Sequence, residues 1–141
     1  MTIEAGLERV DEFVVEDRLV TDVGGTIGVS VLSTPGMIAM MERTAARLGA
    51  EHLPDGRPTV GFEVCVRHVG AAGEGARCTA TARLREIEDG RKLRFDVEVR
   101  EGERVIGTGT HERRAVEKRG PAARDVPESP ATAARQGLSG S

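Results

Sequence analysis

The spacing of apolar residues changes once along the chain, and the change separates one helix from a series of strands. Between Thr34 and Gly49, apolar side chains recur every three or four residues, which is the period of one helical face. Thr34 followed by Pro35 is typical of a helix start, because a hydroxyl can cap the helix and the N–H that proline lacks has no partner there. Gly49 is a typical stop. The pattern predicts a helix over residues 35–48. Its apolar stripe consists of Met37, Ile38, Met41, Ala45 and Leu48.

After this helix the apolar period becomes two, which is typical of β-strands. In residues 91–100, RKLRFDVEVR, apolar and polar residues alternate strictly, and Asp89-Gly90 before them is a strong hairpin signal. The predicted extended segments are residues 10–21, 59–68, 76–88, 91–100 and 104–117. One helix and an antiparallel sheet of about five strands define an α+β fold, in which we expect the sheet to curl around the helix. The flat apolar surface left on such a sheet predicts a dimer.

Two strands carry further information about packing. In residues 59–68, alternation places one set of side chains on a single inward face: Val60, Phe62, Val64, Val66 and His68. In the last strand, Gly107 and Gly109 share the face of Val105 and His111. Glycines on an otherwise filled face indicate that another part of the molecule packs closely there.

Composition excludes several classes of protein. The 141 residues contain 20 Lys and Arg against 23 Asp and Glu, a net charge of −3, which gives no electrostatic reason to expect nucleic-acid binding. There are three aromatic residues, all Phe, and no apolar run long enough to span a membrane. The acidic start lacks a signal-peptide pattern, so we expect a cytoplasmic protein. Residues 118–141 are rich in Pro, Ala and Ser and predict a flexible tail after a domain of residues 1–117.

The two cysteines do not have the spacing of a metal site. Cys65 and Cys78 lie thirteen positions apart with no CxxC or HxxxH pattern nearby, whereas zinc requires four grouped ligands. We expect no metal and interpret the cysteines as two buried thiols in neighbouring strands.

Glu42 is the first candidate for chemistry, because it falls at the edge of the apolar stripe of the helix. Apolar surroundings disfavour the charged form of a carboxylate, as a general base requires. The alternative is a glutamate paired with a nearby arginine. Thr34 lies on the same helix side and is either a plain cap or a group that faces substrate. The N–H groups of Gly36 and Met37 at the helix start could hold an oxyanion.

Three residues on the strands complete the set of candidates. His68 ends an apolar row and is either a core histidine or a proton donor or acceptor at the mouth of a pocket. Gly61 can let a ligand approach the backbone. Arg113 belongs to a charged strand end that is either solvated or able to anchor a phosphate or carboxylate.

Three segments together resemble a known family. They are residues 34–42 (TPGMIAMME), 61–68 (GFEVCVRH) and 107–113 (GTGTHER), and in order and spacing they are similar to fluoroacetyl-CoA thioesterase and its relatives over about residues 8–116. The resemblance implies the hot-dog fold, in which an antiparallel sheet wraps a central helix and two sheets join edge to edge in a dimer. It implies catalytic roles for Thr34, Glu42 and His68.

The resemblance also assigns binding roles. It implies that the Gly61 backbone orients the substrate carbonyl and that Arg113 lies near the acyl-CoA site. The fluoroacetate enzyme carries phenylalanines in a lid segment, whereas the matching residues 23–29, VGGTIGV, contain no aromatic residue. An aromatic-free, glycine-rich lid excludes water poorly, so we expect an acyl preference other than fluoroacetyl.

The leading hypothesis is a homodimeric hot-dog thioesterase, possible also as a tetramer, that hydrolyses an acyl-CoA or acyl-carrier-protein thioester. Glu42 would act as general base or nucleophile, assisted by Thr34 and His68, with no cofactor beyond the coenzyme A or phosphopantetheine of the substrate. The alternative is a non-catalytic acyl-thioester or small-ligand binding module on the same fold. A hydratase or dehydratase is a weaker option, because His52 is poorly placed for an Asp/His pair at the helix start.

Overall fold

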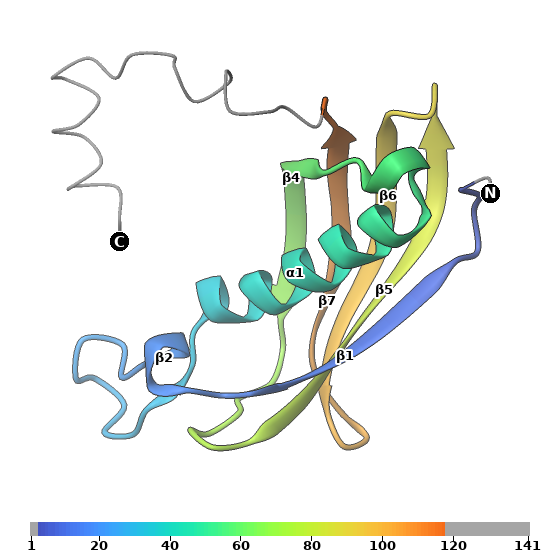
Figure 1. The fold of residues 1–141 in the computed structure, drawn as a ribbon. Coiled ribbons are helices and arrows are strands. Elements are labelled where there is room, and N and C mark those ends of the chain that lie inside the picture. The colour runs from blue at the N-terminus through green and yellow to red at the C-terminus, as the bar shows by residue number, and fades with distance from the viewer. Residues whose placement is uncertain (1–2, 118–141) are drawn as a thin grey trace, which may run out of the picture.

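One long helix packs against one face of a curved antiparallel sheet in the computed structural model, which describes residues 3–117 (Figure 1). The helix is α1 (Thr34–His52), and the five-stranded sheet has the order β1-β5-β6-β7-β4. The strands are β1 (Glu8–Val14), β4 (Thr59–His68), β5 (Arg77–Glu88), β6 (Lys92–Glu101) and β7 (Arg104–Ala115). Two short strands, β2 (Val20–Thr21) and β3 (Val31–Leu32), form a separate ribbon. The predicted α+β class is confirmed. Residues 118–141, predicted as a tail, lie outside the described residues.

The helix begins and ends differently from the prediction. Its cap is Ser33, whose hydroxyl accepts a hydrogen bond from the Gly36 N–H at 3.0 Å, and Thr34 is the first helical residue. The helix also continues through Gly49 to His52. Gly49 is buried, and a methyl group there would contact the Thr59 side chain at 3.4 Å. The glycine therefore allows the sheet to approach the helix and does not end it.

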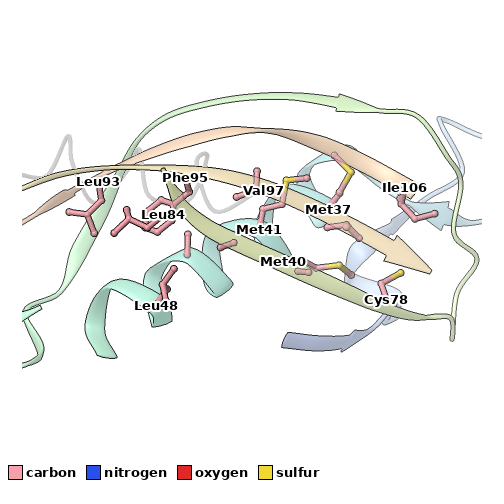
Figure 2. Close-up of a cluster of buried hydrophobic side chains, with 14 of the residues drawn as sticks. Met37, Met40, Met41, Leu48, Cys78, Leu84, Leu93, Phe95, Val97 and Ile106 are labelled. Carbon is pink, nitrogen blue, oxygen red and sulfur yellow. The ribbon is translucent and has the colours of Figure 1, made fainter. Parts of the chain in front are cut away.

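The core lies between α1 and the concave face of the sheet. Met37, Met40, Met41 and Leu48 of the helix are buried against apolar side chains of β5, β6 and β7 (Figure 2). The alternation predicted for β6 is confirmed. Its buried residues are Leu93, Phe95, Val97 and Val99. This burial of apolar surface on one face fixes the distance between the helix and the strands that carry the candidate site residues.

The inward face predicted for residues 59–68 was wrong for Val60 and Phe62, because β4 contains a β-bulge before Glu63. β4 lies at the edge of the sheet, and its pairing with β7 shifts between Gly61 and Glu63, so that Phe62 is an extra residue. Gly61 faces the helix, but the Phe62 ring lies under the Arg114 guanidinium, 3.6 Å from its centre, and is 59% exposed. A single inserted residue thus moves Phe62 out of the inward row.

The close packing predicted at the glycines of the last strand is confirmed. A methyl group at Gly107 would overlap the Met37 side chain, and one at Gly109 would overlap the backbone of β4 at Cys65 and Val66. These two glycines allow both the helix start and the edge strand to lie directly on β7.

The expectation for the cysteines was right for the burial of Cys78 but wrong for Cys65 and for their placement in neighbouring strands. Cys78 is buried on β5, where burial raises the pKa of its thiol, but Cys65 is exposed on β4. β6 and β7 lie between these two strands, so the cysteines are not in neighbouring strands. No helix within residues 3–117 is both long and apolar enough to cross a membrane.

Candidate active site

The first part of the candidate site joins the beginning of the helix to the end of the edge strand. Thr34 is the first residue of α1 and His68 the last residue of β4, and the Thr34 Oγ1 lies 2.8 Å from the His68 Nδ1. The Thr34 side chain is exposed, and His68 is half-buried. His68 also lines an open pocket with residues 31–32 and 69–71. Two residues 34 positions apart in the sequence are therefore in hydrogen-bond contact at an accessible position.

The second part lies two helical turns further along α1, at Glu42. This half-buried glutamate lines an open pocket together with residues 61–64 and His111. A methyl group at Gly61 would stand 3.0 Å from the Glu42 Oε2 and would crowd the carboxylate. The absence of a side chain at Gly61 therefore lets the carboxylate of the helix approach the bulge of β4 closely.

These two parts do not converge within one chain. Thr34 and Glu42 are eight residues apart on one helix, which corresponds to about 12 Å along its axis. The pocket at His68 and the pocket at Glu42 share no lining residue. One thioester carbonyl cannot touch both groups of the same chain at this distance.

The backbone donors expected at the helix start are already engaged. The Gly36 N–H donates to the Ser33 hydroxyl at 3.0 Å, and the Met37 N–H donates to the Ser33 carbonyl at 2.9 Å. Gly36 also lies so close to the Leu19 carbonyl that a methyl group would stand 2.7 Å from it. The expectation that Gly36 and Met37 offer free N–H groups was wrong, because Ser33 and not Thr34 caps the helix.

Arg113 lies inside the protein beside the Glu42 pocket. It is 8% exposed, its Nε donates to the Thr59 hydroxyl at 2.6 Å, and its Nη2 donates to the Thr59 carbonyl at 2.8 Å. Its Nη1 lies on the side of Gly61 that faces Glu42. Burial lowers the pKa of Arg113, and the nearby Glu42 opposes this shift. The guanidinium is thus placed next to the carboxylate and not at the rim, where a phosphate would be met.

The sequence did not single out His111, which occupies the centre of this cluster. The imidazole is 3% exposed and stacks against Phe95 with ring centres 6.3 Å apart. Its Nδ1 lies 2.8 Å from the Glu63 carbonyl oxygen, and its Nε2 lies 3.2 Å from the Arg113 Nη1. Burial lowers the pKa of His111, as does the charge of Arg113. The sequence did contain one signal for this residue: the alternation of the last strand places His111 on the same face as Gly107 and Gly109.

The segment that matches the lid is open in this structure. Residues 22–30, between β2 and β3, are all exposed, and Gly24, Gly25 and Gly28 adopt positive φ angles. In residues 3–117, no three His, Cys, Asp or Glu side chains are grouped so as to hold a metal ion.

A sheet curved around one central helix, with a carboxylate on that helix and a histidine at the end of the edge strand, defines a hot-dog protein of the thioesterase superfamily. The model of the fluoroacetyl-CoA-specific thioesterase family matches residues 14–119, and the chain belongs to this family.

Similar proteins support this placement. The chain is 38% identical over 86 residues to the fluoroacetyl-CoA thioesterase of Streptantibioticus cattleyicolor, a match that spans 61% of this chain and 61% of that relative. A solved structure of the fluoroacetyl-CoA thioesterase FlK is 29% identical, with a TM-score of 0.75 over 91% of this chain and 100% of that one. A Thermus thermophilus protein described as a thioesterase superfamily member is 28% identical, with a TM-score of 0.72 over 82% and 85%.

Proposed function

We propose that the protein hydrolyses an acyl thioester of coenzyme A or of an acyl carrier protein, with Glu42 as the group that activates water. The observation that carries the proposal is the Glu42 carboxylate, held 3.0 Å from the position that a side chain at Gly61 would occupy and open to a pocket. A carboxylate in such a place can take a proton from water as the oxygen attacks the carbonyl carbon. The carbon–sulfur bond then breaks, and a carboxylic acid and a thiol are released.

A second route uses the same carboxylate as a nucleophile. Glu42 would then attack the thioester carbonyl, release the thiol and form a mixed anhydride, which water hydrolyses. The Gly61 backbone lies beside the carboxylate in both routes and is suited to orient the substrate carbonyl.

The protein is proposed to act as a homodimer that joins two β4 strands edge to edge. Within residues 3–117, β4 pairs on one side only, with β7, and Val60, Phe62 and Val64 are 50%, 59% and 37% exposed. An unpaired edge strand with exposed apolar residues is a ready template for pairing. Antiparallel pairing centred on Val64 would set His68 of the partner subunit opposite Val60.

This dimer would complete the site. The neighbour of Val60 is Gly61, beside Glu42, so the Thr34–His68 pair of one protomer would lie close to the Glu42 of the other. Thr34 and Glu42 of one chain lie about 12 Å apart along the helix, too far to act on one carbonyl. In the dimer, the Thr34 and the Glu42 that act together would come from different chains. In this arrangement Thr34 and His68 would align water or the acyl group, and His68 would move a proton.

The acyl preference is proposed to differ from fluoroacetyl. Residues 22–30 are exposed and contain no aromatic residue, so they offer little apolar surface to a small acyl group and exclude water poorly. Hydrolysis rates over short, branched and aromatic acyl thioesters should show no selectivity for fluoroacetyl-CoA. A preference for fluoroacetyl-CoA over acetyl-CoA by more than about tenfold in kcat/KM would contradict this proposal.

The central test compares Glu42→Gln with the unchanged protein in a thiol-release assay. The substitution keeps size and hydrogen bonding but removes the proton acceptor, so kcat should fall by about 100-fold or more. Arg43→Gln, at an exposed position on the same helix, is the matched control and should leave kcat unchanged. A Glu42→Gln protein with unaltered kcat would remove Glu42 from the mechanism.

A mixing experiment tests the shared site. Glu42→Gln and His68→Ala chains are each expected to be inactive alone. After the two are unfolded together and refolded, mixed dimers contain one site with both changes and one site with neither, so activity should return. No recovery, with mixed dimers demonstrated by native mass spectrometry, would place both residues of each site in one chain.

Non-catalytic binding of acyl thioesters is a second candidate, favoured by the open lid, since binding does not require the exclusion of water. Thermal-shift measurements with coenzyme A and acyl-CoAs, followed by thiol release, distinguish the two functions. Stabilisation without release of free thiol would support the binding module.

A further inference from the structure

His111 holds a central place in the Glu42 pocket, although it occupies no position that the proposed reaction uses. It lies on β7 opposite Val64 of β4, two residues beyond the bulge. The ring is 3% exposed and contacts three elements: Phe95 of β6 behind it, the backbone of β4 beside it, and the pocket of α1 in front. A polar ring buried at this junction must have its hydrogen bonds satisfied within the protein.

The two nitrogens of the ring have distinct, fixed roles. The Glu63 carbonyl oxygen can only accept, so the Nδ1 carries the proton and donates to it at 2.8 Å. The Nε2 is then the unprotonated nitrogen and accepts from the Arg113 Nη1 at 3.2 Å. Neither nitrogen is left for substrate. His111 therefore cannot be the proton-transfer group, and any effect it has on the reaction must act through its two partners.

Both partners determine the surroundings of Glu42. Glu63 is the residue with which regular pairing resumes after the bulge, and this bulge turns Gly61 toward the Glu42 carboxylate. The Arg113 Nη1 lies on the same side of Gly61, 3.6 Å from where a methyl group would stand. The His111 imidazole thus links β4 to the Arg113 guanidinium, and both of these lie beside the Glu42 carboxylate.

We propose that His111 is a positioning residue, which fixes the β4 bulge and the Arg113 guanidinium relative to the Glu42 carboxylate. The proposal rests on the proposed hydrolysis. The charged groups that face the ring are Glu42 from α1 and Arg113 from β7, and Glu63 of β4 lines the same pocket. The Arg113 Nη1 and the Glu42 Oε2 lie near the same point beside Gly61, so the position of Arg113 sets the charge that the carboxylate faces.

Two substitutions separate the two hydrogen bonds. In His111→Asn the side-chain amide can still donate to Glu63, but Arg113 loses its acceptor. In His111→Gln the side-chain carbonyl can reach the former Nε2 position and accept from Arg113, but the bond to Glu63 is lost. Both should lower kcat by about 10- to 100-fold, with KM changed by less than about threefold, since the alignment of the carboxylate is affected and the binding surface is kept.

The rate–pH profile provides a readout that a merely structural role would not change. With Arg113 loosened, His111→Asn should lose activity on the acid side at a higher pH than the unchanged protein, whereas His111→Gln should retain the original acid limb. Unchanged kcat and unchanged pH profiles in both folded variants would overturn the proposal. So would a loss of kcat that equals the unfolded fraction measured by circular dichroism.

Thr59→Val provides an independent variant if a His111 substitution prevents folding. It removes the hydroxyl that accepts from the Arg113 Nε at 2.6 Å, while Thr59→Ser retains it. Thr59→Val should shift the acid limb as His111→Asn does, and Thr59→Ser should not. An unchanged rate–pH profile in Thr59→Val would contradict the role of Arg113.

If Glu42→Gln keeps full activity, the proposed function itself fails. If Glu42→Gln is inactive but all these variants match the unchanged protein, only the positioning role fails.

Discussion

The Thr34 Oγ1 lies 2.8 Å from the His68 Nδ1, so the first residue of the helix is bonded to the last residue of the edge strand. Thr34 does not cap the helix, since the Ser33 hydroxyl does so. Its hydroxyl is therefore free to fix the orientation of the imidazole, and a change at Thr34 can alter the histidine without altering the helix.

Replacing Thr34 by valine should reduce activity far more than replacing it by serine. Valine has nearly the shape of threonine but no hydroxyl, so His68 loses its partner, and kcat should fall by about 100-fold. Thr34→Ser keeps the hydroxyl and should stay within about tenfold of the original kcat. Thiol release at saturating substrate measures both. Equal activities of the two variants would show that the hydroxyl has no part in the reaction.

The cap assignment leads to a prediction about stability. Ser33→Ala removes the acceptor for the Gly36 N–H and should lower the free energy of unfolding by about 1 kcal/mol. Thr34→Ala removes no cap and should change it by less than about 0.5 kcal/mol. Urea unfolding followed by circular dichroism compares the two proteins. A larger loss in Thr34→Ala than in Ser33→Ala would mean that threonine caps the helix in solution.

The elements that the sequence predicted well are those in which one local rule applies. The helical stripe and the alternation in residues 91–100 each follow from burial of one face, and the structure has a helix and a strand there. The bulge in β4 could not be predicted, because the apolar alternation continues through Phe62 as though the strand were regular. Likewise, two adjacent hydroxyls precede Pro35, and only the tertiary contacts of the helix start decide that Ser33 is the cap.

The candidate site also contains residues that the local sequence pattern identified and one residue that only the tertiary structure reveals. Glu42 was chosen as a candidate from its place at the edge of the helical stripe, and His68 from its place at the end of an apolar row. His111 was not assigned a role, because in sequence it opens a run of charged residues. Its burial depends on Phe95 of β6 and the bulge of β4, which are brought to it only by the sheet.

Gly109 should tolerate no side chain, because an added methyl group would meet the backbone of the neighbouring edge strand, β4. A methyl group would overlap the Cys65 carbonyl and stand 2.8 Å from the Val66 Cα, and backbone atoms cannot move aside as a flexible side chain can. Gly109→Ala should therefore lower the free energy of unfolding by about 1–3 kcal/mol. Gly73→Ala is the matched control, since nothing lies within 4 Å of its added methyl group. If the two variants have the same midpoint in urea, the close approach of β4 to β7 is wrong.

The pKa of His111 is lowered by burial from its ordinary value of 6.5, and this makes stability depend on pH in a definite direction. The unfolded chain binds a proton at this residue near pH 6.5, but the folded protein resists it. The contribution of His111 to the free energy of unfolding is therefore fully present above pH 6.5. It falls as the pH is lowered below 6.5, by up to about 1.4 kcal/mol per pH unit.

His111→Gln cannot titrate in this range and should abolish that part of the dependence. The measurement is the free energy of unfolding in urea at intervals from pH 7.5 to pH 5, for the unchanged protein and the variant. His52 and His68 are present in both proteins, so the difference between the two curves reports His111 alone. The curves should diverge in slope below pH 6.5, with the unchanged protein losing stability faster. Parallel curves would mean that the imidazole takes up its proton as readily in the folded protein as in the unfolded chain.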